Sequence, residues 1–174
     1  MSKLTEITQK ATHRWFLLRK DLQRVRANAP RSPKQILFII GCQRSGTTLM
    51  TEILEKDWDV KVYPEHSPLS NQDRLDGLRL NPLPEVKRAL DADRYPLVVL
   101  KPLVETQNAD GLLEFFPRSR AIWMYRHYRD VANSNLKRFG MDNGRKNLSH
   151  IARNDITNWR AERLPQEVRD LVMQ

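Results

Sequence analysis

The feature that most constrains this chain is a short apolar run that ends in a glycine-rich turn. Residues 36–40 read ILFII, and they lead directly into GCQRSGTTLM at 41–50. A continuous run of this kind, rich in β-branched residues, is typical of a strand buried on both faces of a parallel sheet. The residues from 47 to 56 have helical composition. The pattern therefore predicts a buried strand, a tight turn and a helix in immediate succession.

Two further apolar runs, LVVLK at 97–101 and RAIWMY at 120–125, repeat the strand pattern. The other expected elements are a short strand at 60–63 and helices at about 85–90, 109–116, 130–138, 149–161 and 165–173. Strands that alternate with helices predict an α/β domain with a parallel β-sheet flanked by helices. We assign this domain to residues 35–174, behind a proline-containing linker at 28–34.

Residues 1–28 precede that domain and predict an amphipathic, basic N-terminal helix. Its apolar residues recur at spacings of three and four, at Leu4, Ile7, Ala11, Trp15, Leu18, Leu22 and Val25. Several arginines and lysines occupy the rest of the helix. We expect the apolar stripe to pack on the domain or on another subunit. Contact with a membrane surface is a less favoured alternative.

Charge and cysteine content limit the classes of function. The formal net charge of +9 suggests a polyanionic partner, such as nucleic acid, a nucleotide with several phosphates or an acidic saccharide. The single cysteine, Cys42, excludes an internal disulfide framework, and no Cys/His cluster has the spacing of a zinc site. No signal-peptide pattern opens the chain, and no apolar run approaches the roughly 20 residues that span a bilayer. We therefore expect a cytoplasmic protein without a metal centre.

The glycine-rich turn has the spacing of a phosphate-binding loop, G-x-x-x-x-G-K-[ST], but lacks its lysine. Gly41, Gly46 and Thr48 match the motif, Thr47 stands in the lysine's position, and the nearest cation is Arg44. Backbone N–H groups and the positive end of a helix can hold an anion here, and both threonine hydroxyls can add donors. ATP and GTP are disfavoured, because triphosphate chemistry needs a cation at the β- and γ-phosphates together with Mg²⁺. The loop therefore predicts one nucleotide phosphate, bound without metal.

A second constellation follows the strand at 120–125. Arg126 lies just past the carboxyl end of that strand, where open parallel sheets bind ligands, and Ser134 falls in the second turn of the next helix. A bidentate arginine and a serine hydroxyl could converge on a further phosphate. Taken alone, the two residues fit a strand-end arginine and a solvated helix serine at least as well.

Together, GCQRSGTTLM and YRHYRDVANS resemble the two cofactor motifs of sulfotransferases that use 3′-phosphoadenylyl sulfate (PAPS). In that family the first motif binds the 5′-phosphosulfate, and the second, R-x-x-[KR]-D-x-x-x-S, binds the 3′-phosphate. The resemblance spans residues 36 to about 140 and implies a P-loop NTPase-like fold. The residues that it implies for PAPS binding are Arg44, Ser45, Gly46, Thr47, Thr48, Arg126 and Ser134. The implied reaction is in-line transfer of the sulfuryl group to a hydroxyl or amine, with adenosine 3′,5′-bisphosphate as product.

The resemblance also implies catalytic roles. Arg44 would stabilise charge on the bridging oxygen, and Lys101, at the end of a strand beside the loop, could reach the leaving group. The K-T-H pattern that supplies a histidine base in cytosolic small-molecule sulfotransferases reads K-P-L here. Branches that act on tyrosine or heparan chains use a glutamate after the first helix, so Glu65 is the expected base, with His66 in reserve. The chain is shorter than the family's usual catalytic domains, which implies a compact domain or a truncated form.

Other functions remain open at this point. One is a Mg²⁺-dependent nucleotide kinase of unusual sequence, and another is a non-catalytic basic module that binds nucleic acid or nucleotides. A nucleotide-binding remnant without activity is a further alternative. Nucleic acid is disfavoured, because the sequence has no recognisable nucleic-acid fold signature. The acceptor, whether saccharide, peptide, lipid or small molecule, and the oligomeric state are not specified by the sequence.

Overall fold

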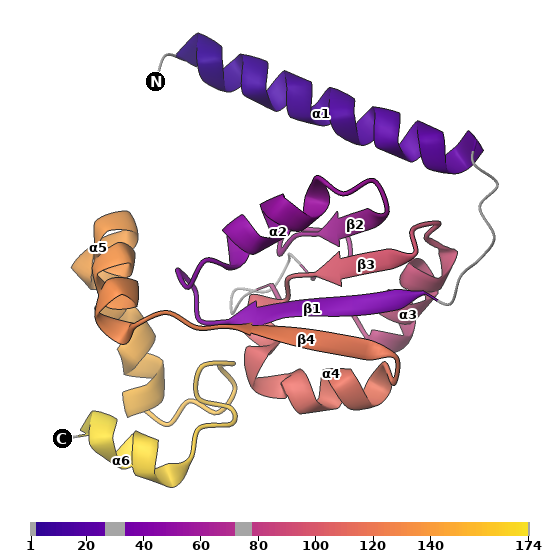
Figure 1. The fold of residues 1–174 in the computed structure, drawn as a ribbon. Coiled ribbons are helices and arrows are strands. Elements are labelled where there is room, and N and C mark those ends of the chain that lie inside the picture. The colour runs from indigo at the N-terminus through magenta and orange to yellow at the C-terminus, as the bar shows by residue number, and fades with distance from the viewer. Residues whose placement is uncertain (1–2, 27–33, 72–77, 174) are drawn as a thin grey trace.

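The computed structural model describes residues 3–26, 34–71 and 78–173, and its centre is a four-stranded parallel sheet (Figure 1). The strands are β1 (Gln35–Gly41), β2 (Val60–Tyr63), β3 (Leu97–Leu100) and β4 (Ser119–Met124), in the order β2-β3-β1-β4. Every neighbouring pair is parallel. The predicted α/β domain with a parallel sheet flanked by helices is therefore confirmed. Because all four strands run the same way, the loops that follow them meet at one edge, which we call the carboxyl edge.

Helices cover both faces of this sheet. On one face, α2 (Thr47–Glu55) contributes Met50 and Leu54 to a core built on buried Ile39 and Val99. On the other face lie α3 (Leu83–Ala92) and α4 (Ala109–Phe115). The buried side chains of this second core are Phe38, Ile40, Leu69, Val86, Leu90, Tyr95, Val98, Leu100, Leu112 and Phe116. Burial of these apolar side chains from water is the main force that holds the layers together.

The N-terminal helix, α1 (Lys3–Arg26), lies outside the sheet layers, beyond α2 (Figure 1). The apolar stripe does not pack on the domain, so this part of the expectation is wrong, whereas packing on another subunit stays a prediction. The exposed stripe residues are Ile7 at 66%, Trp15 at 66%, Leu18 at 61%, Leu22 at 57% and Val25 at 57%. The opposite side of the helix faces the domain, where Lys20 is only 2% exposed. Periodicity identifies an apolar face, but it does not say which face the rest of the chain will contact.

The C-terminal part differs from its prediction. Helix α5 (Tyr128–Ala152) continues past the predicted end and bends at Gly140, whose φ of 76° lies in the left-handed region. The helix predicted at 149–161 is wrong beyond Ala152, because residues 149–152 belong to α5 and turns follow. The last helix, α6 (Gln166–Met173), agrees with the prediction. The predicted linker at 28–34 lies almost entirely outside the described residues.

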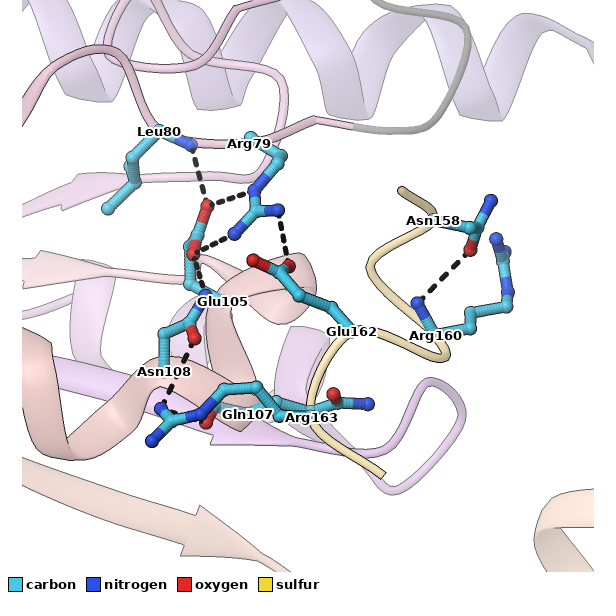
Figure 2. Close-up of polar contacts among 9 residues, drawn as sticks. All are labelled: Arg79, Leu80, Glu105, Gln107, Asn108, Asn158, Arg160, Glu162 and Arg163. Carbon is cyan, nitrogen blue, oxygen red and sulfur yellow. Dashed lines mark hydrogen bonds and ion pairs between the residues drawn. The ribbon is translucent and has the colours of Figure 1, made fainter. Parts of the chain in front are cut away.

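Polar contacts fix the turns between α5 and α6 to a short 3-10 helix, η1 (Leu103–Asn108), that follows β3 (Figure 2). Arg79 bonds the carboxylate of Glu105 at 3.0 and 3.2 Å and that of Glu162 at 2.7 Å. Arg163 donates to the Gln107 carbonyl oxygen at 2.8 Å and to Asp110 at 2.7 Å. These contacts hold Glu162 and Arg163 against η1 and the start of α4.

No helix in the described ranges combines the length and the apolar character that crossing a membrane requires.

Candidate functional site

The turn after β1 is a tight loop whose backbone enters the left-handed region three times. Gly41 has φ 137°, Arg44 has φ 72° and Gly46 has φ 100°. The loop closes on itself, because the amide of Ser45 donates to the Cys42 carbonyl oxygen at 3.1 Å and its hydroxyl donates to the same oxygen at 2.6 Å. The left-handed conformation costs Arg44 of the order of 1 kcal/mol, which the glycines avoid. Helix α2 begins directly after this closed loop.

Gly41 is required for a second reason, which is the close approach of β4. A Cβ atom at this position would lie 2.4 Å from the carbonyl oxygen of Met124. The missing side chain therefore lets the end of β4 pack directly against the loop. Arg126 follows β4 by two residues, so this approach places Arg126 beside the loop.

Thr106 of η1 forms a hydrogen bond with the same glycine. The Gly41 amide donates to Thr106 Oγ1 at 3.2 Å, and that hydroxyl lies 2.8 Å from the Leu103 carbonyl oxygen. Sequence reasoning missed this residue, because a lone threonine in a segment with no apolar periodicity carries no motif signal. Thr106 fixes the position of the loop relative to the turn after β3.

The first turn of α2 offers unoccupied backbone donors. Gly46 is its N-cap residue, and no side chain caps the helix there. The first N–H groups of a helix have no partner within the helix, and the helix dipole makes this end positive. Thr47 is buried, whereas Thr48 is exposed. This end of α2 can therefore hold an anion.

Lys101 and Glu65 meet beside that turn. The ammonium group of Lys101, a residue only 8% exposed, donates to Thr48 Oγ1 at 3.1 Å. The same ammonium group lies 3.7 Å from the carboxylate of Glu65. The neighbouring His66 is exposed. The structure thus joins Lys101 and Glu65 to the loop through Thr48.

Arg126 and Ser134 both reach Arg44. Arg44 Nε donates to Ser134 Oγ at 3.0 Å, and Arg126 Nη1 donates to the Arg44 carbonyl oxygen at 3.4 Å. Arg126 also forms a solvent-exposed ion pair of 3.9 Å with Asp130, one turn along α5. The residues predicted from the two motifs therefore form one group at the carboxyl edge. Arg44 is a residue of the loop, and its side chain also contacts Ser134 of α5.

The charges at this edge favour an anion. Three cations, Arg44, Lys101 and Arg126, face two carboxylates, Glu65 and Asp130. Desolvation raises the pKa of the Cys42 thiol, so this loop residue adds no negative charge near neutral pH. Within residues 3–26, 34–71 and 78–173, no group of three or more His, Cys, Asp or Glu side chains is placed to hold a metal ion.

Comparisons of the chain with protein-family models, with curated proteins and with solved structures gave no match. The chemistry of this site is therefore inferred from its own residues and geometry.

Proposed function

We propose that this protein transfers a sulfuryl group from PAPS to a hydroxyl or amine acceptor, on a P-loop NTPase-like sheet. The observation that carries the proposal is the meeting of Arg126 and Ser134 with Arg44 at the glycine-rich turn. An uncapped helix end and a cluster of guanidinium and hydroxyl donors then lie side by side. Such a pair suits one nucleotide that carries negative charge at two separate positions.

In this proposal the loop and the first turn of α2 bind the 5′-phosphosulfate, and Arg126 with Ser134 binds the 3′-phosphate. The acceptor oxygen or nitrogen attacks sulfur while the bond from sulfur to the bridging oxygen breaks, and the electron pair of that bond leaves with the 5′-phosphate. Glu65 takes the proton from the acceptor. Lys101, which is held by both Thr48 and Glu65, stabilises the charge that develops on the departing oxygen.

The contact between Lys101 and Thr48 disfavours the kinase alternative. In a triphosphate-binding loop the hydroxyl at the position of Thr48 is a Mg²⁺ ligand. Here that hydroxyl accepts a hydrogen bond of 3.1 Å from an ammonium group. A divalent cation at the same hydroxyl would be repelled by the lysine at close range.

The proposal is tested by calorimetric titration in the presence of a chelator. Adenosine 3′,5′-bisphosphate and ADP each carry two phosphates, but the second phosphate is attached at a different position in each. We expect adenosine 3′,5′-bisphosphate to bind at least about tenfold more tightly, since one or two charge-assisted hydrogen bonds would be lost with ADP. Equal affinities would overturn the proposal, and Mg²⁺-dependent turnover of ATP would replace it with the kinase.

A basic module that binds nucleic acid makes a different prediction. It would bind DNA or RNA with a steep salt dependence, and adenosine 3′,5′-bisphosphate would not displace the nucleic acid. Competition between the two ligands at one salt concentration separates this alternative from the sulfotransferase.

The role of Glu65 is tested by Glu65→Gln, which keeps the shape of the side chain and a polar group beside Lys101. Transfer of radiolabelled sulfate from PAPS would be followed on a phenol, a tyrosine peptide, a desulfated saccharide and a hydroxylated lipid. We expect turnover to fall by about 10²- to 10⁴-fold while nucleotide affinity is retained. His66→Gln is the matched control and should change turnover little. Full activity in Glu65→Gln would remove Glu65 from the mechanism.

A further inference from the structure

The outer face of α1 is an uncovered apolar surface. We define it by the stripe residues Ile7, Ala11, Trp15, Leu18, Leu22 and Val25, all of which are exposed. Figure 1 shows α1 as the outermost element on its side of the molecule, with no other element of the drawn chain beyond it. From Ile7 to Val25 the stripe runs roughly 27 Å along the helix axis. Scattered single apolar residues are normal on protein surfaces, but a continuous stripe of this length indicates a contact surface.

Contacts on the opposite side of α1 hold the stripe outward. The ammonium group of Lys20 donates to the Glu55 carbonyl oxygen at 2.7 Å, and Phe16 packs edge-on against Trp58 with ring centroids 5.3 Å apart. Asp21 accepts a hydrogen bond from the hydroxyl of Tyr95 at 2.6 Å. Turning the stripe toward the domain would break all of these contacts at once. The outward orientation is therefore built into the helix and the surface beneath it.

Exposed arginines border the stripe. Arg14 lies one turn from Leu18, Arg19 one turn from Trp15, and Arg26 one turn from Leu22, and all three arginines are exposed. The guanidinium of Arg19 lies over the ring of Trp15, 6.0 Å from its centroid. Along residues 7–26 the one acidic side chain is Asp21, which bonds Lys61 and Tyr95 on the domain side. The stripe therefore has cationic borders, and Asp21, the one acidic residue a turn away from Leu18 and Val25, is already bonded to Lys61 and Tyr95.

From this combination we propose that the outer face of α1 binds the surface of an anionic lipid membrane, with the helix lying parallel to it. The apolar side chains enter the boundary between headgroups and acyl chains, and the arginines contact the anionic headgroups. Tryptophan with a neighbouring arginine suits this boundary, because the ring is apolar while the cation reaches water and phosphate. A second copy of the chain fits less well, since two such faces would bring arginines against arginines, and the one acidic side chain beside the stripe, Asp21, is already bonded to Lys61 and Tyr95. The proposal is independent of nucleotide binding.

The test is co-sedimentation of the full chain with phosphatidylcholine vesicles, with and without phosphatidylserine. We expect binding that requires phosphatidylserine and weakens with added salt. The variant Leu18→Ser/Leu22→Ser should bind at least about tenfold more weakly, because two inserted side chains lose their apolar contact. The variant Arg14→Gln/Arg26→Gln should lose about fivefold per arginine on vesicles with phosphatidylserine. Leu148→Ser/Leu171→Ser removes two leucines of similar exposure elsewhere and should leave binding unchanged.

Three results would overturn the proposal. One is a wild-type protein that stays in the supernatant with anionic vesicles at low salt. Another is vesicle binding that Leu18→Ser/Leu22→Ser retains in full. The third is a dimer, seen by light scattering without vesicles, that the same variant converts to a monomer, because a second copy would then cover the stripe. Thermal unfolding of each variant confirms that the comparison is made between folded proteins.

Discussion

Helices α1 and α3 are both amphipathic, yet they present their apolar faces in opposite directions. In α3, Val86 and Leu90 are 0% exposed and pack into the core beneath the sheet. In α1, Leu18 and Leu22 are 61% and 57% exposed, while the polar side of the helix contacts the domain. The chain thus uses one helix to close its core and the other to present an apolar surface.

The difference follows from what each helix must contact. Helix α3 connects β2 to β3, two adjacent parallel strands, so it has to cross the face of the sheet and bury its apolar side there. Helix α1 contacts the end of α2, the turn before β2 and the edge strand β2 itself, where the Glu55 carbonyl oxygen, Asp59 and Lys61 are its polar partners. Because this surface of the domain is polar, the polar side of α1 packs against it. The position of a helix in the topology therefore decides the orientation that its periodicity leaves open.

The largest expected effect is a difference in stability between two leucine truncations. Leu90→Ala in α3 should lower the free energy of unfolding by about 2–5 kcal/mol, because it leaves a cavity in a fully buried site. Leu22→Ala in α1 should change that free energy by no more than about 0.5 kcal/mol. Urea unfolding of both variants measures the contrast. Similar losses would mean that the stripe of α1 is covered by the domain in solution.

A smaller loss of unfolding free energy is expected when a polar contact that holds a segment in place is removed. Glu105→Gln should cost about 1–3 kcal/mol, because it removes the charge that partners the Arg79 guanidinium at a buried position (Figure 2). Glu162→Gln is the control, since it removes the other, more exposed carboxylate of Arg79 and should cost less than about 1 kcal/mol. Urea unfolding that ranks the two variants the other way would contradict the assigned importance of Glu105.

The stability that Glu105 contributes should depend on pH. Burial alone would raise its pKa, but hydrogen bonds from Arg79 and Asn108 outweigh burial and hold the pKa below its ordinary value of 4.5. A carboxyl whose folded pKa is lowered contributes its full stability above the unfolded pKa and loses it as pH falls through the folded pKa. The stability difference between wild type and Glu105→Gln should therefore stay constant from pH 7 to about pH 5 and shrink at lower pH. A difference that already shrinks between pH 7 and pH 5 would contradict this.

The smallest stability effect is expected at the inward face of α1. Burial lowers the pKa of Lys20, although Glu55 and Asp57 oppose that shift. Lys20→Met keeps the apolar stem and removes the hydrogen bond to the Glu55 carbonyl oxygen, so we expect a loss of about 1 kcal/mol. Faster hydrogen exchange of the α1 amides would report the loosened helix, with Arg14→Met as the exposed control. Unchanged exchange in Lys20→Met would show that this contact does not hold the helix.

Much of the sheet could be predicted from sequence, because its strands are continuous apolar runs. The run at 36–40 and the run at 97–101 correspond to β1 and β3, whose buried side chains admit few alternatives. Helix ends were harder to predict. The residues after Ala152 form turns instead of the predicted helix, because they include Asn154, Asp155 and Asn158, which favour turns, and because Glu162 and Arg163 bond distant residues.

The candidate site was predictable to the extent that its residues form motifs. The spacing of Gly41, Gly46, Arg126 and Ser134 pointed to one edge of the sheet, and the structure brings Arg126 and Ser134 to Arg44. The contact of Lys101 with Thr48 could be expected only in outline, because it depends on the register of β3 beside β1. Thr106 had no sequence signal at all, since its role arises from the close packing of η1 on Gly41.

We propose that the carboxyl edge holds one nucleotide at two phosphates, and Arg126→Gln removes the guanidinium that would bind the second of them. In calorimetric titrations, this variant should bind adenosine 3′,5′-bisphosphate at least about tenfold more weakly while its affinity for ADP changes little. Arg145→Gln, which alters an exposed arginine further along α5 and outside the motif, should leave both affinities unchanged. An equal loss for both nucleotides, or no loss for either, would show that Arg126 does not read a 3′-phosphate and would contradict the account.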